Sequence, residues 1–258
     1  MFDINGIKLR RRYFFQISYK GTAYHGWQKQ AGANTVQETI EQALHKILKK
    51  EVHIVGCGRT DTGVHASQYY FHLNTEHEMN ADMLFVLNKE LPDDISVHKI
   101  LEVNPDIHAQ FSAVQRTYTY RVHTVKDPFL SDLSAYYQLD NFNIAEVIKA
   151  VNLLNGEWDF RSFCVTPARH SNTVCRIHKA IFIEDESTNG FMFRITGDHF
   201  LRGMVRIITG KLIEIGSGRM TVAEFRHHLE KGERFKFLNQ AYPQGLYLSQ
   251  IKYSSVPE

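Results

Sequence analysis

Two hydrophobic periodicities alternate along this chain, and they limit its fold more than any other feature. In residues 115–124, successive side chains point to opposite faces of a predicted strand, so that Tyr118 and Tyr120 share one face. Residues 35–50 instead repeat apolar side chains at helical spacing, and Thr35 and Glu38 form the capping-box pair typical of a helix start. The chain therefore belongs to the mixed α and β class.

The other segments follow the same two patterns. The predicted strands span 13–20, 51–57, 67–74, 94–103, 115–124, 173–185, 190–198 and 245–253. The predicted helices span 35–50, 80–90, 143–156, 199–218 and 221–232, with Gly156 placed to end the third of them. Strands joined by hairpins as well as by helices predict an α+β fold with mainly antiparallel sheets. Pro105 marks the one boundary, which divides an N-terminal half, 1–105, from a C-terminal half, 106–258.

Composition describes an ordinary globular protein. The 258 residues are 43% hydrophobic, enough for one large domain or two small ones, and the formal net charge is +2. No apolar run approaches the roughly 20 residues of a membrane helix, and the N-terminus lacks the pattern of a secretion signal. The three scattered cysteines argue against a disulfide framework. These features predict a cytoplasmic protein that does not enter a membrane.

The stretch GCGRTDTGVHA, residues 56–66, lies between two predicted strands and is the first candidate site. Its glycines let the backbone approach a ligand closely or adopt positive φ. Asp61 in such a loop can be a nucleophile, a general base, a metal ligand or a turn residue. The loop lacks the Gly-Lys-Ser/Thr ending of a phosphate-binding loop and the glycine spacing of a dinucleotide fingerprint.

Two other side chains fit either a functional or a structural role. Arg206 lies within the apolar segment 199–218, where it reaches solvent or meets a carboxylate, and Arg202 lies one turn earlier on a similar face of the predicted helix. Tyr118, which alternates with Tyr120 on a predicted strand, is by default a structural tyrosine of the core. The cysteines and histidines show no metal-ligand spacing, and no nucleophile-elbow motif supports Ser-His-Asp catalysis. Taken singly, these residues do not define a reaction.

Five segments, taken in order, resemble the TruA family of tRNA pseudouridine synthases. GRTDTGVHA, residues 58–66, is similar to that family's active-site loop. The other similar segments are YFFQISYKGTAYHGWQKQ with TVQETIEQAL, RTYTYRV, FLRGMVRIITG and GLYLSQIKY. The similarity covers roughly residues 13–253 and is far more specific than any single motif.

The resemblance implies a fold, a reaction and a catalytic trio. The family's fold is two α+β halves with mainly antiparallel sheets joined across a central RNA-binding cleft. The family works as a homodimer, uses no cofactor or metal, and isomerises uridines 38, 39 and 40 in the anticodon stem-loop of tRNA. Asp61 would be the catalytic aspartate, Arg206 its ion-pair partner and Tyr118 the aromatic residue beside the target uracil.

The resemblance also implies RNA contacts. Arg59 would help displace the target base and hold the place that it leaves. The other RNA-binding positions would be His65, His108, Gln110, Arg116, Arg169 and Arg202. Two positions depart from the family pattern, because Gln110 stands where an arginine is usual and Tyr242 where a proline is common. The first departure weakens one expected RNA contact.

Two other functions remain open at this point. An RNA-binding module or tRNA-folding chaperone would bind tRNA without forming a modified base, and the intact set of Asp61, Tyr118 and Arg206 argues against it. A metal-dependent hydrolase would lose activity to chelators, and the histidine spacing gives it little support.

Overall fold

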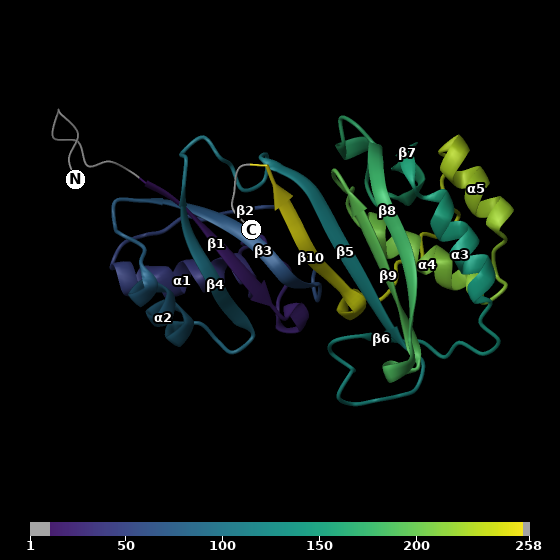
Figure 1. Ribbon diagram of the computed structural model, residues 1–258, viewed down its shortest axis with the longest axis horizontal. Helices are drawn as coiled ribbons and strands as arrows, with labels where there is room; N and C mark the ends of the chain where they lie inside the picture. The colour runs from purple at the N-terminus through teal and green to yellow at the C-terminus, as the bar shows by residue number, and fades with distance from the viewer. Residues whose placement is uncertain (1–10, 255–258) are drawn as a thin grey trace. The chain divides into compact units, whose positions relative to one another are not determined.

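The computed structural model describes residues 11–254, which pack as two compact units. Among the described residues, the first unit comprises 11–114 and 248–254, and the second spans Gln115–Tyr247. Figure 1 labels the elements of both. No helix among the described residues is long and apolar enough to cross a membrane.

The first unit is a sheet with helices packed against it. Its strands are β1 (Arg11–Tyr19), β2 (Val55–Gly56), β3 (His65–Thr75), β4 (Ile95–Val103) and β10 (Leu246–Tyr253), and its helices are α1 (Val36–Leu48) and α2 (Ala81–Glu90). The strand order is β4-β1-β3-β10, with β2 paired to β3, and β1 is antiparallel to both β3 and β4. α1 begins at its cap Thr35, whose hydroxyl accepts from Glu38 N at 3.4 Å. Aromatic pairs fill this core, among them Phe15 stacked on Phe71.

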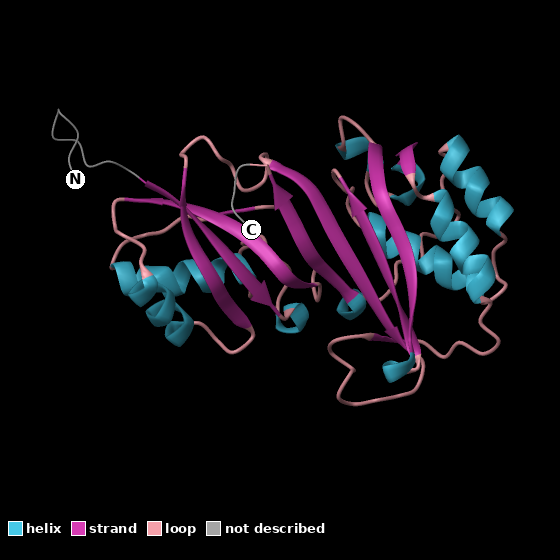
Figure 2. Cartoon of the chain, in the orientation of Figure 1, coloured by secondary structure: helices cyan, strands magenta, loops and turns pink. Residues whose placement is uncertain are grey.

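The second unit repeats this design with three helices. Its strands are β5 (Ala113–His123), β6 (Ala135–Tyr136), β7 (Gly156–Asp159), β8 (Val174–Asp185) and β9 (Gly190–Gly197), and its helices are α3 (Ile144–Leu153), α4 (Met204–Gly216) and α5 (Val222–Lys231). The order β5-β9-β8-β7 is antiparallel throughout, and the short pair β5–β6 is parallel. Figure 2 shows α3, α4 and α5 grouped together beside this sheet. α4 is buried along nearly all of its length, as expected of a largely apolar helix. The α+β class with mainly antiparallel sheets is confirmed.

Three predicted boundaries are wrong. The helix predicted over 199–218 begins only at Met204, because Gly203 adopts φ +73 and a Cβ there would press on Val165. The strand predicted over 51–57 shortens to β2. Gly156 does not end α3, whose last turn closes at Leu154; it adopts φ +108 and opens β7, which the sequence did not predict.

Candidate active site

The loop that carries Asp61 joins β2 to β3 and is tied to β3 at its start. Cys57 N donates to Tyr70 O at 2.8 Å, and the Tyr69 hydroxyl donates to Gly58 O at 2.5 Å. Burial raises the pKa of Tyr69 well above its usual value, so its hydroxyl stays protonated and remains a donor. The first half of the loop is therefore fixed on the sheet.

The second half of the loop is tied to the segment that follows β1. Trp27 N donates to Thr60 O at 3.3 Å, and Gly63 N donates to Tyr24 O at 3.2 Å. The hydroxyls of Thr60 and Tyr19 lie 2.9 Å apart in the interior. Gly26 makes this approach possible, because it adopts φ +85 and a Cβ there would collide with the Thr60 carbonyl oxygen.

Three buried aromatic side chains pack together beside the loop, and two of them, Tyr19 and Tyr69, contact it through their hydroxyls. The Trp27 and Tyr69 rings stack with centroids 4.1 Å apart, and the Tyr19 ring meets Tyr69 edge-on at 5.6 Å. All three side chains are buried. Close-packed rings of this kind leave the backbone above them little freedom to move.

This loop presents two charged side chains of opposite sign. Asp61 is half-buried and its carbonyl oxygen accepts from Val64 N at 3.1 Å, which closes a turn. Arg59 is exposed and makes no hydrogen bond or ion pair with other described residues. Nothing lies within 4 Å of where a Gly58 Cβ would stand, so the backbone beside Arg59 is open. A carboxylate and a guanidinium thus project from one rigid loop beside open space.

His65 lies inside the first unit and not on its surface. Its side chain is 1% exposed, and Nδ1 accepts from Gly21 N at 2.9 Å. The ring therefore ties the start of β3 to the segment after β1. An RNA contact through the His65 ring is not available in this conformation.

His108 and Gln110 lie in the turn before β5. His108 Nδ1 accepts from Gln110 N at 3.1 Å and from Phe111 N at 3.3 Å, and burial together with the nearby Arg12 lowers the His108 pKa. The Phe111 ring stacks on His108 with centroids 4.4 Å apart and is 78% exposed. The Gln110 side chain is exposed as well. The turn is internally braced and presents an aromatic and an amide to solvent.

Tyr118 and Arg116 lie on β5 in the second unit. The Tyr118 ring is half-buried and meets Phe200 edge-on with centroids 5.0 Å apart. Arg116 Nη1 donates to Asp198 O at 3.0 Å. The segment after β9 therefore supports both side chains.

Arg206 lies in the first turn of α4 and is fixed by the segment before β10. Its Nε donates to Ala241 O at 2.7 Å, and its carbonyl accepts from Ala241 N at 3.0 Å. Burial raises the pKa of Tyr120 and Tyr137 against a smaller opposing effect of the Arg206 charge. The guanidinium is thus half-buried beside neutral phenols, where a positive charge is weakly screened.

Arg169 and Arg202 are both exposed, and the backbone of each lies close to Val165 in the chain or through a hydrogen bond. Arg202 O accepts from Val165 N at 3.1 Å, and Arg169 lies just beyond, in the 3-10 turn Pro167–Arg169. Arg234 Nη2 donates to Val165 O at 3.2 Å, so one guanidinium is bonded to this segment. Arg202 is not on α4, contrary to the prediction, because the helix begins after Gly203.

The structure brings the predicted residues together in two groups. The first unit holds Arg59 and Asp61 on one loop with His65 beneath it, and His108 and Gln110 on one turn. The second unit holds Tyr118 and Arg116 on β5, Arg206 on α4, and the exposed pair Arg169 and Arg202. The supporting residues Tyr19, Tyr69 and Phe200 were missed, because only long-range packing reveals them.

Other nucleophiles and metal sites find little support. Cys57, Cys164 and Cys175 are buried free thiols, and burial raises the pKa of Cys175 to about 12. A buried protonated thiol is a poor nucleophile. Within residues 11–254, no three His, Cys, Asp or Glu side chains gather as metal ligands would.

Known proteins match the chain over nearly its whole length. A family model described as tRNA pseudouridine synthase matches residues 16–112 and 150–254. A protein named tRNA pseudouridine synthase A from Porphyromonas gingivalis is 37% identical over 249 residues, which are 95% of this chain and 98% of that protein. Proteins of the same name from Bacteroides fragilis and Listeria welshimeri are 39% and 38% identical over 94% of this chain, and 96% and 99% of those proteins. A solved structure of an unknown protein from Galdieria sulphuraria covers 73% of this chain and 81% of that one at 6% identity, with a TM-score of 0.22, too low to inform the fold.

Proposed function

The chain belongs to the tRNA pseudouridine synthase family of isomerases, and we propose that it converts uridines 38, 39 and 40 of the tRNA anticodon stem-loop with Asp61 as the nucleophile. The reaction breaks the N1–C1′ glycosidic bond, turns the uracil, and joins C5 to C1′. The proton lost from C5 is balanced by one gained at N1. The atoms balance without an oxidant, a reductant or an energy source.

One observation carries this proposal, namely the anchoring of the Asp61 loop. The loop is bonded to β3 on one side and to Trp27 and Tyr24 on the other, while Gly58 leaves its outer side open. A carboxylate held in this way starts the reaction by attacking C1′, by attacking C6, or by removing the C2′ proton. Each route requires an ionised Asp61 and a fixed position relative to the ribose.

Tyr118 and Arg206 complete the proposed trio. Tyr118 stacks on the target uracil, and its hydroxyl, or a base that it positions, removes the C5 proton in the last step. Arg206 acts as the ion-pair partner of Asp61, since an opposite charge favours the ionised carboxylate. The hydrogen bond of Arg206 Nε to Ala241 O supports this role, because it fixes the direction of the guanidinium.

The proposed RNA contacts come from side chains that are exposed, or half-buried in the case of Arg116 and His108. Arg59 takes the place of the displaced base, whose removal from the stack costs a few kcal/mol. Arg169 and Arg202 contact phosphates, and Arg116, His108 and Gln110 make further contacts to the RNA. His65 is assigned a supporting role, because its ring is buried.

Tritium release tests the proposal directly. Purified protein is incubated, without added cofactor, with unmodified tRNA that carries tritium at uracil C5. We expect release into water, mapped to positions 38–40, and its loss in Asp61→Asn with folding and tRNA binding retained. Turnover in Asp61→Asn would overturn the nucleophile assignment. Tight tRNA binding without release would favour the chaperone instead.

The Asp61–Arg206 pair has its own test. In Arg206→Met the carboxylate loses its partner, so the acid limb of the rate–pH profile is expected to move to higher pH. The same profile in both proteins would show that the two side chains do not pair.

A homodimer in the cytoplasm is the proposed working form. Each active site would then draw RNA contacts from both subunits, so a monomeric variant would lose tRNA affinity. Sedimentation equilibrium at twice the chain mass is the expected result. Full activity in a monomer would contradict it.

A further inference from the structure

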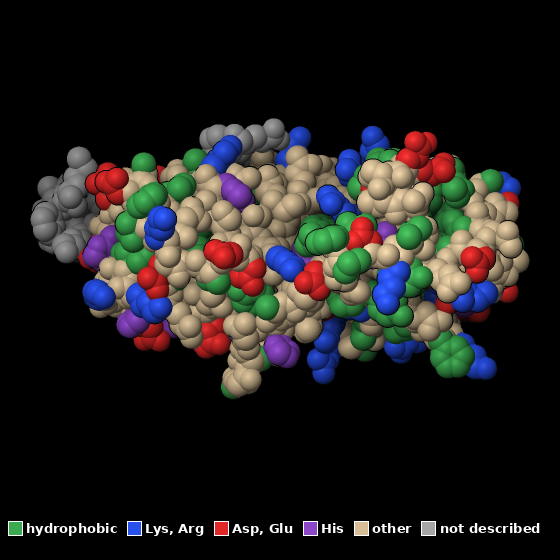
Figure 3. Space-filling model, turned by 90° about the horizontal axis from the view of Figure 1, so that it is seen from below, with side chains coloured by type: hydrophobic (Ala, Val, Ile, Leu, Met, Phe, Trp, Pro, Cys, Tyr) green, Lys and Arg blue, Asp and Glu red, His purple; other side chains and the backbone are tan. Residues whose placement is uncertain are grey.

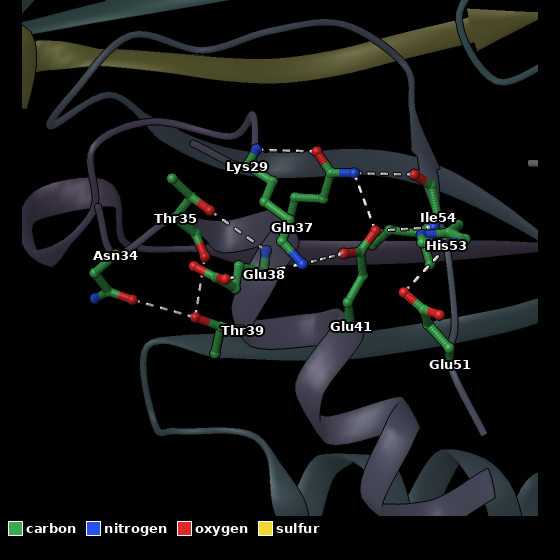
Figure 4. Close-up of polar contacts among 10 residues, drawn as sticks. All are labelled: Lys29, Asn34, Thr35, Gln37, Glu38, Thr39, Glu41, Glu51, His53 and Ile54. Carbon is green, nitrogen blue, oxygen red and sulfur yellow. Dashed lines mark hydrogen bonds and ion pairs between the residues drawn. The ribbon is translucent and has the colours of Figure 1, made fainter. Parts of the chain in front are cut away.

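Two side chains of α1, Gln37 and Glu41, face the segment that enters β2. They lie one helical turn apart and both reach Ile54, as Figure 4 shows. Neither belongs to the proposed catalytic trio or to the RNA contacts. Here they are called the α1 clamp.

Both polar atoms of the Gln37 side chain and its backbone N–H make hydrogen bonds. Its Oε1 accepts from Lys29 N at 3.1 Å, and its Nε2 donates to Ile54 O at 3.2 Å and to Glu41 Oε1 at 3.1 Å. Its backbone N donates to Trp27 O at 3.0 Å. The partners fix which way the amide points, since Lys29 N only donates while the carboxylate and the Ile54 carbonyl only accept.

Glu41 provides the second half of the clamp. Its side chain is 6% exposed, Oε1 accepts from Ile54 N at 3.2 Å, and Oε2 lies 3.4 Å from Lys29 Nζ. Both backbone polar groups of Ile54 are therefore satisfied by helix side chains. The clamp does for Ile54 what a neighbouring strand does for a strand residue.

The clamp joins the two segments that hold the Asp61 loop. Ile54 leads through β2 directly into Cys57 and the first half of the loop. The Trp27–Lys29 segment, held by Gln37, bonds the second half through Trp27 N and Thr60 O. We therefore expect that a shift of α1, or the loss of either side chain, displaces both ends of the Asp61 loop.

We propose that Gln37 and Glu41 are positioning residues that set the place of the Asp61 carboxylate during catalysis. This inference rests on the proposed function, in which Asp61 reacts with the target nucleoside. β2 is only two residues long, so its ladder with β3 contributes few of the hydrogen bonds that fix the start of the loop on the sheet. The clamp adds a constraint from the helix side at Ile54, and a misplacement of about 1 Å at a reacting group can slow a reaction on the order of 100-fold.

Three variants separate positioning from folding. Gln37→Glu keeps the shape but replaces two donors with acceptors opposite Ile54 O and Glu41. Glu41→Leu removes the acceptor for Ile54 N, while Glu41→Gln keeps one oxygen there and loses only the ion pair with Lys29. We expect kcat to fall about 10- to 100-fold in Gln37→Glu and Glu41→Leu and to stay within about threefold in Glu41→Gln.

The measurement is multiple-turnover tritium release at saturating tRNA, which gives kcat, with tRNA Kd and thermal unfolding recorded for each variant. Lys46→Met is the matched control, because Lys46 lies on the same helix but pairs with Glu90 of α2. Unchanged Kd with reduced kcat in the folded variants, and recovery in Glu41→Gln, supports positioning. Wild-type kcat in folded Glu41→Leu, or equal loss in Glu41→Leu and Glu41→Gln, would overturn it. Asp61→Asn is assayed in parallel, so a wrong nucleophile assignment shows itself separately.

Discussion

His72 on β3 links the pH to the stability of the first unit. Its side chain is 4% exposed and its Nδ1 accepts from Ala109 N at 3.2 Å. Burial, followed by the nearby charges of Arg12 and His108, lowers the His72 pKa from 6.5 to about 4. Between pH 6.5 and pH 4, His72 is therefore neutral in the folded protein and protonated in the unfolded chain. Stability from this source is complete above pH 6.5 and is lost as the pH falls through 4.

Urea unfolding at several pH values checks this prediction. We expect wild-type protein to lose on the order of 3 kcal/mol between neutral pH and pH 4 through this one group. His72→Gln keeps an acceptor for Ala109 N but does not titrate there, so its free energy of unfolding falls less steeply. His53→Gln, at a side chain that is 77% exposed, is the matched control. Parallel curves for His72→Gln and wild type would contradict the assignment.

Single residues differ in how far the sequence reveals them. The glycines around Asp61 predicted an accessible loop between strands, and the structure has that loop between β2 and β3. The burial of His65 was not predicted, because its partner Gly21 N lies 44 positions earlier in the chain. The α1 clamp was also missed, since Gln37 and Glu41 have the pattern of an ordinary polar helix face.

At the scale of elements, hydrophobic periodicity predicted the helices and strands whose pattern is local. α1 starts at its predicted cap, and β8 and β9 flank a turn close to the predicted one. The start of α4 depends instead on Val165 and Gln240, which crowd Gly203 from distant parts of the chain. No periodicity within residues 199–218 carries that information.

Gly210 in α4 provides the prediction at this scale. A Cβ there would collide with the carbonyl oxygen of Asn239, so the segment that bonds Arg206 crosses the helix at this glycine. Alanine normally favours a helix by about 1 kcal/mol over glycine. We expect the opposite for Gly210→Ala, a loss of about 1–3 kcal/mol from overpacking, with lower activity because Ala241 no longer holds Arg206 in place.

Thermal unfolding and tritium release check both parts. Gly218→Ala is the control, because Gly218 lies just past the same helix at φ +71 with nothing within 4 Å of a Cβ. It tests backbone strain alone and is expected to cost about 1 kcal/mol with no loss of activity. A Gly210→Ala protein as stable and active as wild type would show that the Asn239 segment moves aside freely.

At the scale of the whole molecule, sequence order and packing diverge. β10 ends the described chain but lies beside β3 in the first unit, where Ile251 N donates to Gln68 Oε1 at 2.8 Å. Strand pairing between distant segments leaves little trace in a single sequence, whereas the strand itself was predicted from its alternation. The small net charge of +2 likewise does not indicate a charged surface. On the face shown in Figure 3, basic and acidic side chains are interspersed.

Salt dependence tests how a chain of net charge +2 holds a polyanion. With so small a total, affinity for tRNA depends on a few arginines at phosphates, and Arg169 and Arg202 are exposed around Val165. Each phosphate contact releases bound counterions, so Arg169→Gln and Arg202→Gln are each expected to reduce the slope of log K against log salt by about 1. Filter binding from low to moderate salt measures the slope, with Arg226→Gln as control because Arg226 pairs with Glu230 on α5. The loss of a phosphate contact must reduce the slope whatever the tRNA sequence. An unchanged slope in both variants would therefore mean that other residues bind the phosphates.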